Sequence, residues 1–350
     1  MRILHVLESF AAGGIETTFL NVLRSFRAED PSIQHDVLAF AGGPLEQGYR
    51  EAAHAVRIGG DTATIDAHVG GGYDVAHVLF ERCAYRLVPE LLARSSTRVV
   101  YGKNYDLGGM YRLNEGLRWQ ADESMLAACD GATFTTPNLA AGYTLPKGRT
   151  TVLRKAADVA RFRALADPEL TTPRRIVCVA NLHPRKRLGD LVVAFERVLR
   201  EVRDAELRLV GGGSEAESDR LMALAAHLGV AERVSLAGLQ ADVVPEIAQA
   251  RIVALPSSCE GVPTALLEGM AAGRPAVATD VGHVSSIIDD GVEGYLVALG
   301  NVAALADRLT RLLTDPALAA RMGRAARRRA TVHDVTAVSR TLLGVLRVAA

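Results

Sequence analysis

Residues Arg251–Asp280 read RIVALPSSCEGVPTALLEGMAAGRPAVATD, and this stretch decides the fold class. The apolar run Arg251–Leu255 is typical of a buried strand, a helix is expected to begin near Thr264, and a second apolar run follows at Pro275–Thr279. Strands that alternate with helices in this way indicate a parallel sheet with helices on both faces.

The same alternation of strand-like and helical segments runs along most of the 350 residues, in two series. The series meet at Ala164–Arg175, where Asp-Pro and Thr-Thr-Pro interrupt the pattern and no apolar face is present. Each series is long enough for its own sheet, since domains span about 100–200 residues. We therefore predict an α/β protein of two doubly wound, Rossmann-like domains, 1–163 and 164–334, that face each other across a cleft. Residues 335–350 are expected to form a helix that packs back on the body.

The composition excludes several classes of protein. The 40 Lys and Arg residues balance the 40 Asp and Glu residues, whereas a general nucleic-acid binder would carry a basic excess. The four cysteines form no C-x-x-C pair, which argues against a zinc site of the usual spacing and against a disulfide framework. No apolar run approaches the ~18–20 residues that span a bilayer. We expect a cytoplasmic protein with no nucleic-acid partner and at most peripheral membrane contact.

The loop between the strand and the helix of this stretch is the place where a ligand is expected. Ligands of parallel sheets bind at the carboxyl ends of the strands, against helix N-termini. The N–H groups that open the helix near Thr264 are suited to an anionic group such as a diphosphate. Glu260 lies in the loop and Glu268 lies about one turn into the helix, and carboxylates placed here would be stabilised by the hydroxyl groups of a sugar. The sequence therefore predicts a site for a diphosphate and a sugar.

Four motifs together resemble a known family. Glu260 and Glu268 form an E-x7-E arrangement that resembles the signature of glycosyltransferase family 4, whose members are retaining enzymes with the GT-B fold. Gly13–Glu16 is similar to the family's Gly-Gly-x-Glu loop, Val179–Lys186 stands at its basic diphosphate-binding segment, and Asp289–Leu296 resembles its D-G-x-x-G-x-L turn. The resemblance extends over almost the whole chain, and it implies that the first domain binds the acceptor and the second the nucleotide sugar.

The resemblance also implies roles for single residues. Glu260 would contact hydroxyl groups of the donor sugar, and Glu268 would contact the ribose hydroxyls of the nucleotide. Lys186 would stabilise the negative charge that grows on the leaving nucleoside diphosphate, so that Lys186 and Glu260 are the expected catalytic residues. The other expected donor-binding residues are Gly14, Asn181, Gly261, Val262, Pro263, Thr264, Ala265 and Leu266. Because the protein itself supplies this charge, no metal and no cofactor is expected besides the nucleotide-sugar co-substrate.

Two departures from the family pattern concern substrate binding. The arginine that the family usually places five positions before Lys186 is replaced by Asn181, although Arg185 and Arg187 flank the lysine. The histidine that the family often places in a loop near the acceptor is absent from Tyr101–Tyr105, so no general base is assigned. The residues expected near the acceptor are Lys103, Asn104 and Tyr105.

The sequence thus predicts a retaining, metal-independent glycosyltransferase. It would move a sugar from a nucleoside diphosphate sugar, with UDP favoured, to a hydroxyl or amine on a small-molecule, glycan or lipid-linked acceptor. Two alternatives stay open: a GT-B nucleotide-sugar epimerase, and a non-catalytic sugar-nucleotide-binding subunit that supports a partner transferase. His5 and His77 lie in strand-like runs and are expected in the core, or behind the residues that contact a substrate, rather than in catalysis.

Overall fold

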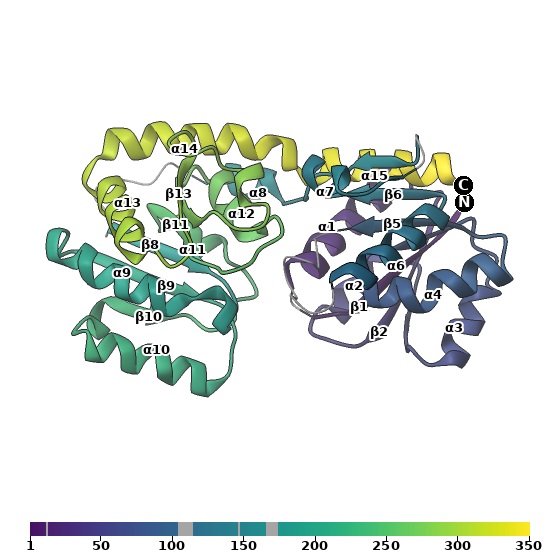
Figure 1. Ribbon diagram of the computed structural model, residues 1–350, viewed down its shortest axis with the longest axis horizontal. Helices are drawn as coiled ribbons and strands as arrows, with labels where there is room; N and C mark the ends of the chain where they lie inside the picture. The colour runs from purple at the N-terminus through teal and green to yellow at the C-terminus, as the bar shows by residue number, and fades with distance from the viewer. Residues whose placement is uncertain (12, 104–114, 146–147, 166–173) are drawn as a thin grey trace. The chain divides into compact units, whose positions relative to one another are not determined.

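A computed structural model describes residues 1–11, 13–103, 115–145, 148–165 and 174–350 (Figure 1). The chain divides into two compact units, each with its own hydrophobic core. Unit 1 comprises Met1–Ala156 and His333–Ala350, and unit 2 comprises Ala157–Val332.

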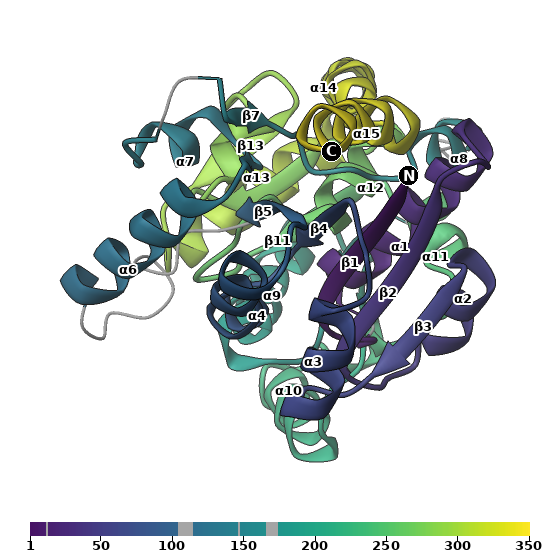
Figure 2. The same ribbon diagram turned by 90° about the vertical axis from the view of Figure 1, so that its right-hand side faces the viewer.

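Unit 1 is built on a parallel sheet of seven strands in the order β3-β2-β1-β4-β5-β6-β7 (Figure 2). The strands are β1 Arg2–Ser9, β2 Gln34–Ala41, β3 Ala55–Ile58, β4 Val75–Val78, β5 Arg98–Lys103, β6 Gly131–Phe134 and β7 Thr150–Val152. The helices described in this unit are α1 Gly14–Glu29, α2 Glu46–Ala52, α3 Thr62–Val69, α4 Glu81–Arg94, α6 Glu115–Ala128, α7 Pro137–Ala141 and α15 Val335–Ala349.

Unit 2 repeats the design with a parallel sheet of six strands in the order β10-β9-β8-β11-β12-β13. The strands are β8 Arg174–Val179, β9 Ala205–Val210, β10 Val234–Leu236, β11 Ile252–Leu255, β12 Ala276–Thr279 and β13 Gly294–Val297. The helices are α8 Val159–Arg163, α9 Leu188–Glu201, α10 Glu215–His227, α11 Val244–Ala248, α12 Thr264–Ala271, α13 Val302–Thr314 and α14 Pro316–Ala330. The 3-10 turns are η1 Pro184–Lys186, η2 Ala231–Arg233, η3 Val284–Ser286 and η4 Thr331–His333. The last of these turns spans the sequence boundary between the two units.

Both strand orders reverse beside the first strand of the unit, between β1 and β4 in unit 1 and between β8 and β11 in unit 2. Ligands of doubly wound sheets bind outside the carboxyl ends of the strands at such a reversal. The prediction of two doubly wound α/β domains is confirmed, and the reversals mark the loops after β8 and β11 as the place to look for the predicted donor site.

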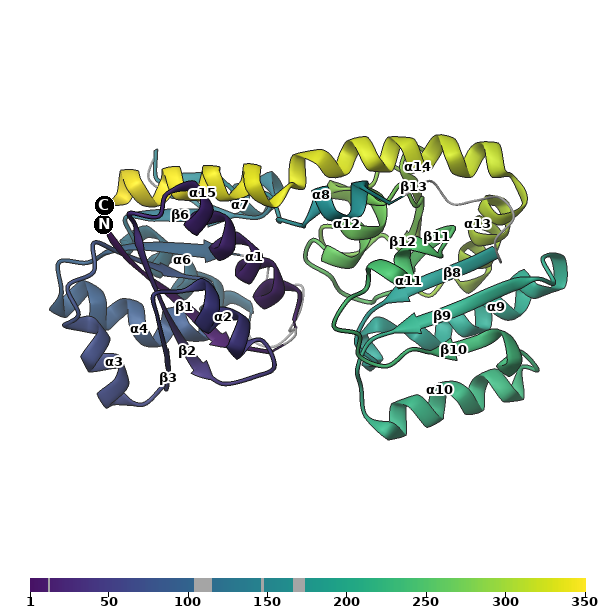
Figure 3. The same cartoon turned by 180° about the vertical axis from the view of Figure 1, so that it is seen from behind.

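The division between the units falls before α8, whereas the sequence placed it after residue 163. The reason is packing: Val159 and Phe162 of α8 are buried in the core of unit 2. The last helix, α15, packs on unit 1, where it lies beside α1 (Figure 3) and buries Leu342 and Leu346 in that core.

Three buried histidines form a chain of rings in the core of unit 1. His5 on β1 contacts His77 on β4, with 3.3 Å between the two Nδ1 atoms, and it contacts His35 on β2, with 3.0 Å between His5 Nε2 and His35 Nδ1. Burial lowers the pKa of all three: well below 6.5 for His5, to about 4 for His35 and to about 3 for His77. The rings are therefore neutral at pH 7, and the expectation that His5 and His77 belong to the core is confirmed.

This cluster predicts an acid-sensitive fold. In the unfolded chain each histidine takes up its proton near pH 6.5, before the folded protein does, so the stability that the neutral rings contribute is complete above that pH and is lost as the pH falls towards 4. Each such histidine should cost about 1 kcal/mol of unfolding free energy between pH 6 and pH 5. Urea unfolding at the two pH values should show a smaller loss in His35→Gln than in the wild type. Equal losses in the two proteins would contradict this account.

Candidate functional site

The loop that follows β11 is held from two sides. The Thr279 hydroxyl, at the end of β12, donates to the carbonyl oxygen of the buried Ser257. On the other side, the backbone N–H and the hydroxyl of Ser258 both donate to the carbonyl oxygen of Arg185, at 2.8 and 3.1 Å. Arg185 belongs to η1, in the loop after β8, so these bonds fasten the two loops of the strand-order reversal to each other.

A glycine allows a third segment to reach the same loop. Gly282, just after β12, has φ +56°, and a Cβ atom added to it would lie 1.7 Å from the carbonyl oxygen of Glu260. The backbone of the β12–η3 connection therefore runs directly against Glu260, at a distance that no other residue type permits without displacement. The position of Glu260 is thus fixed by backbone on both sides.

The two residues predicted to be catalytic meet at this place. Lys186, the last residue of η1, donates to Glu260 with 2.6 Å between Nζ and Oε1, and the two side chains are 19% and 11% exposed. Close to them lies Cys178 on β8, whose burial raises the pKa of the thiol to about 12, so that this cysteine stays an uncharged part of the core. The site therefore presents a half-buried, neutral ion pair at the carboxyl edge of the unit 2 sheet.

The other residues of the predicted donor site line the same edge in different ways. Asn181 is exposed just after β8. Val262, Pro263 and Leu266 are buried, so they can offer a ligand only their backbone groups. The remaining members are partly exposed: Gly261, Thr264, Ala265 and Glu268. The helix α12 begins after Pro263, which makes no side-chain capping bond, so the first-turn N–H groups are not capped from that residue.

Gly14, the predicted contact from unit 1, opens α1. Its carbonyl oxygen accepts hydrogen bonds from the Thr18 hydroxyl at 2.6 Å and from Lys155 Nζ at 3.1 Å. Glu16 lies in the first turn of the helix, near this lysine, and burial raises the pKa of its carboxyl. The Gly-Gly-Ile-Glu turn is therefore fastened to the chain that follows β7 within unit 1.

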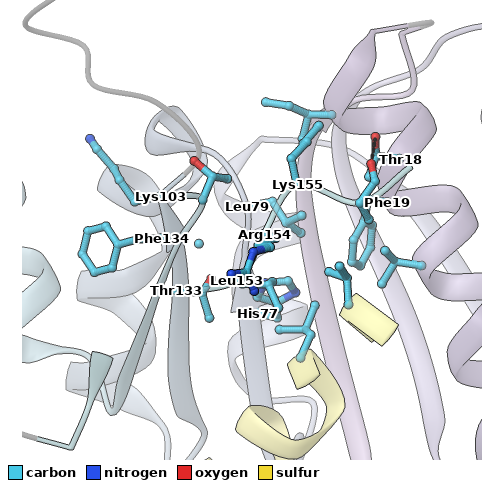
Figure 4. A pocket seen from close by; sticks show the side chains of 17 residues that line it. Thr18, Phe19, His77, Leu79, Lys103, Thr133, Phe134, Leu153, Arg154 and Lys155 are labelled. Carbon is cyan, nitrogen blue, oxygen red and sulfur yellow. Dashed lines mark hydrogen bonds between the residues drawn. The ribbon is translucent and has the colours of Figure 1, made fainter. Parts of the chain in front are cut away.

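Lys103, one of the three residues predicted near the acceptor, lies at the end of β5 in a pocket of unit 1. The pocket measures about 500 Å³ including its open mouth, and Figure 4 shows Thr18 and Phe19 of α1 on one side of it and Lys103 and Phe134 on the other. The Lys103 ammonium pairs with Asp122 at 2.6 Å, and Asp122 also accepts from the Tyr143 hydroxyl at 2.7 Å. Asn104 and Tyr105 lie outside the described residues.

Sequence reasoning missed several residues that line this pocket. His77 was expected in the core or behind the residues of a site, and it is both a core residue and part of the pocket wall. Thr133 lies on β6, which the pattern did not predict, and Lys155 lies in the turn after β7. The only local signal for the pocket was His77 in a strand-like run, and this signal does not show that the histidine ring lines a pocket.

Metal-binding clusters and membrane spans are both absent from the described part of the chain. It contains no group of three or more His, Cys, Asp or Glu side chains placed to hold a metal ion. Within the same residues, no helix is long and apolar enough to cross a membrane.

The close approach at Gly282 predicts a large effect of a small substitution. Gly282→Ala adds a methyl group against the Glu260 carbonyl, whereas Gly291→Ala meets nothing within 4 Å although its φ is also positive, at +82°. A non-glycine residue at positive φ should lower the unfolding free energy of both variants by about 1–2 kcal/mol. Gly282→Ala should lower it by at least about 2 kcal/mol more, because the Glu260 loop must move. Urea unfolding of both proteins measures the difference. Equal losses would show that the backbone contact does not hold the loop.

Comparisons with known proteins place the chain in a family. Residues 173–315 match the model of "Glycosyl transferases group 1". A D-inositol 3-phosphate glycosyltransferase of Salinispora arenicola is 31% identical over 337 residues, which cover 89% of this chain and 72% of that protein. An N-acetyl-alpha-D-glucosaminyl L-malate synthase of Bacillus anthracis is 36% identical over 152 residues, but these cover only 43% of this chain and 39% of that protein.

Among solved structures, HepE of Anabaena in complex with UDP is similar to this chain with a TM-score of 0.85 and 18% identity, covering 99% of this chain and 100% of that one. At this identity the likeness concerns the fold, which is GT-B. The chain therefore belongs to the group 1 glycosyltransferases, the GT4-type family, as its E-x7-E motif predicted.

Proposed function

We propose that the chain transfers a sugar from a nucleoside diphosphate sugar, with UDP favoured, to a hydroxyl or amine of an acceptor, with retention of configuration. The observation that carries the proposal is the ion pair of Lys186 and Glu260 at the strand-order reversal of unit 2. The names of the relatives agree with it, since one is a glycosyltransferase acting on D-inositol 3-phosphate and HepE was crystallised with UDP.

The ion pair explains how one site can accept both halves of a sugar nucleotide. A diphosphate would take over the Lys186 ammonium, and the hydroxyl groups of the sugar would take over the Glu260 carboxylate. A ligand with only one of these halves would leave the other member of the pair half-buried without its partner, which is costly. The pair therefore favours molecules in which an anion and a polyol are joined.

The same arrangement supplies the chemistry of the transfer. As the glycosidic bond breaks, negative charge grows on the leaving diphosphate, and Lys186 together with the first N–H groups of α12 would stabilise that charge most in the transition state. Glu268 on α12 would hold the ribose, and Asn181, Gly14 and the backbone of residues 261–266 would complete the donor site. The acceptor would attack the oxocarbenium-like sugar carbon on the face that the diphosphate leaves, so that configuration is retained, and the departing phosphate would take the acceptor proton.

We further propose that catalysis needs no divalent metal. Lys186 and the helix N–H groups would provide the positive field that a metal supplies in other enzymes.

Kinetics should separate the roles of two residues. Lys186→Ala should lower kcat by about 10²–10³-fold with a smaller change in the donor KM, because the lost charge acts mainly on the transition state. Glu268→Ala should raise the donor KM about tenfold with kcat within a few-fold, because ribose contacts are the same in both states. The control is Arg200→Ala, whose side chain pairs with Glu196 on the surface of α9.

The assay uses any sugar nucleotide and acceptor that support turnover, and calorimetry of UDP follows binding alone. Unchanged kinetics in both Lys186→Ala and Glu268→Ala would overturn the proposed site. Product formed from the donor without an acceptor would indicate a nucleotide-sugar epimerase, and UDP binding without transfer to a broad acceptor panel would indicate a binding subunit.

Metal independence is tested by chelation. Turnover measured in 5–10 mM EDTA is expected to equal turnover without chelator, within about twofold, since the protein supplies the charge on the leaving group. A loss that added Mg²⁺ or Mn²⁺ restores would contradict this part of the proposal.

A further inference from the structure

The floor of the unit 1 pocket contains a small space walled by polar atoms. Gly102 on β5 lines the pocket, and a Cβ atom added to it would lie 3.4 Å from Thr133 Oγ1, 3.5 Å from His77 Nε2 and 3.6 Å from the carbonyl oxygen of Val78. The three atoms come from the strands on either side of β5 and converge on the place where Gly102 has no side chain. We call this space the Gly102 niche.

Most of the surrounding pocket wall is apolar. Figure 4 shows His77 and Thr133 with Leu79, Leu153 and Phe19 around them. The apolar lining residues are Ile15, Phe19, Val22, Leu79, Phe134, Leu153, Ala156, Val338 and Leu342. The other polar or charged lining residues are Thr18, Lys103, Thr135, Arg154 and Lys155. A few polar atoms placed at one point of an apolar wall are typical of a small-molecule site, where they fix the orientation of the ligand.

The histidine chain decides what His77 offers to the niche. The three rings are neutral at pH 7, so they carry three N–H protons, and each of the two ring–ring contacts uses one of them. The third proton then sits at one end of the chain, on Nε2 of His77 or on Nε2 of His35. In the first case His77 is a hydrogen-bond donor towards the niche, and in the second case it is an acceptor.

The surroundings of His35 Nε2, at the other end of the three histidines, indicate which of these two proton positions is occupied. His35 Nε2 is buried and has no hydrogen-bond partner among the described residues, and the ring stacks on Phe26 with the centroids 5.1 Å apart. A buried N–H without a partner is rarer in proteins than a buried acceptor without one. The proton therefore belongs on His77 Nε2, and the pocket-lining groups of the niche are one N–H donor and one hydroxyl.

We propose that this pocket binds a hydroxyl-bearing molecule with an apolar body, whose hydroxyl occupies the Gly102 niche. The hydroxyl accepts from His77 Nε2–H and donates to the Thr133 hydroxyl, and the body lies on the apolar part of the wall. Resting on the proposed function, we assign this molecule as the acceptor substrate, and His77 as a residue that determines its specificity. The role of the niche is binding, and no proton transfer is assigned to it.

The tautomer of His77 is the first test. Long-range ¹H–¹⁵N spectra of the full chain labelled in histidine, with through-bond assignment, distinguish the Nε2–H from the Nδ1–H form. The Nε2–H form is expected at pH 7.5. The Nδ1–H form at His77 would overturn the proposal, because His77 would then be an acceptor.

The second test uses cyclohexanol as the probe and cyclohexanone as its match in shape. Cyclohexanol should shift the His77 resonances in a saturable way, and cyclohexanone should bind about fivefold more weakly because it cannot donate. Equal binding of both compounds, or no shift with cyclohexanol, would count against a hydroxyl niche.

The matched variants are Gly102→Ala and Gly131→Ala. Both substitutions place a methyl group on a strand of the same sheet with no contact closer than 3.4 Å, but Gly131 does not line the pocket. Gly102→Ala should abolish the shift caused by cyclohexanol and raise the KM of any working acceptor about tenfold or more with an unchanged donor KM. Gly131→Ala should behave as the wild type. A wild-type response in Gly102→Ala would overturn the proposal.

Calorimetry of UDP separates this inference from the proposed function. If the wild type binds UDP and Gly102→Ala also binds UDP but not cyclohexanol, both stand. If the wild type does not bind UDP, the proposed donor site is wrong. The response to cyclohexanol then still tests whether the Gly102 niche binds a hydroxyl group.

Discussion

Neighbouring strands of a parallel sheet end at the same edge, and the candidate donor site depends on this constraint. β8 and β11 are adjacent, with Ile252 opposite Ile176. The chain that leaves β8 therefore reaches Lys186 close to where the chain that leaves β11 reaches Glu260, although 74 positions separate the two residues. The Arg185 carbonyl oxygen then fixes the two loops by accepting both hydrogen bonds of Ser258. The ion pair follows from topology first and from side-chain attraction second.

Much of this site could be predicted because its signals are local. Glu260, the start of α12 at Thr264 and the basic segment at Lys186 are each visible within a short stretch of sequence. The strands that the pattern missed are four residues long: Ala55–Ile58, Gly131–Phe134 and Gly294–Val297. Length alone does not explain these misses, since the predicted strands Ile252–Leu255 and Ala276–Thr279 are equally short. Two of the missed strands begin with glycine, which is depleted in strands.

The pocket of unit 1 could not be predicted, for a different reason. His77, Gly102 and Thr133 lie on three strands, and what joins them is the register of β4, β5 and β6 rather than any spacing along the chain. Gly102 contributes to the pocket only by having no side chain. A glycine within a strand is equally typical of a bulge or a tight bend, so its presence in the sequence does not indicate a pocket. Lys103 beside it was visible as a charge near the expected acceptor region, but its pairing with Asp122 depends on the position of α6.

Both sites place polar groups where water is partly excluded, and the two units stabilise these groups in different ways. A polar group in a half-buried site must have a partner before the ligand arrives, or the fold bears the cost of its lost hydration. Unit 2 meets this requirement with two opposite charges that neutralise each other, Lys186 and Glu260. Unit 1 meets it in part, with imidazoles that burial keeps uncharged and that bond to one another at the two ring–ring contacts, while the two terminal Nε2 atoms of the histidine chain have no partner in the described residues. A charged pair is suited to an anionic ligand that separates it, whereas a neutral chain is suited to an uncharged hydroxyl. This difference is the physical basis of the two proposals, a nucleotide sugar in unit 2 and an alcohol in unit 1, although Lys103, Arg154 and Lys155 also line the unit 1 pocket.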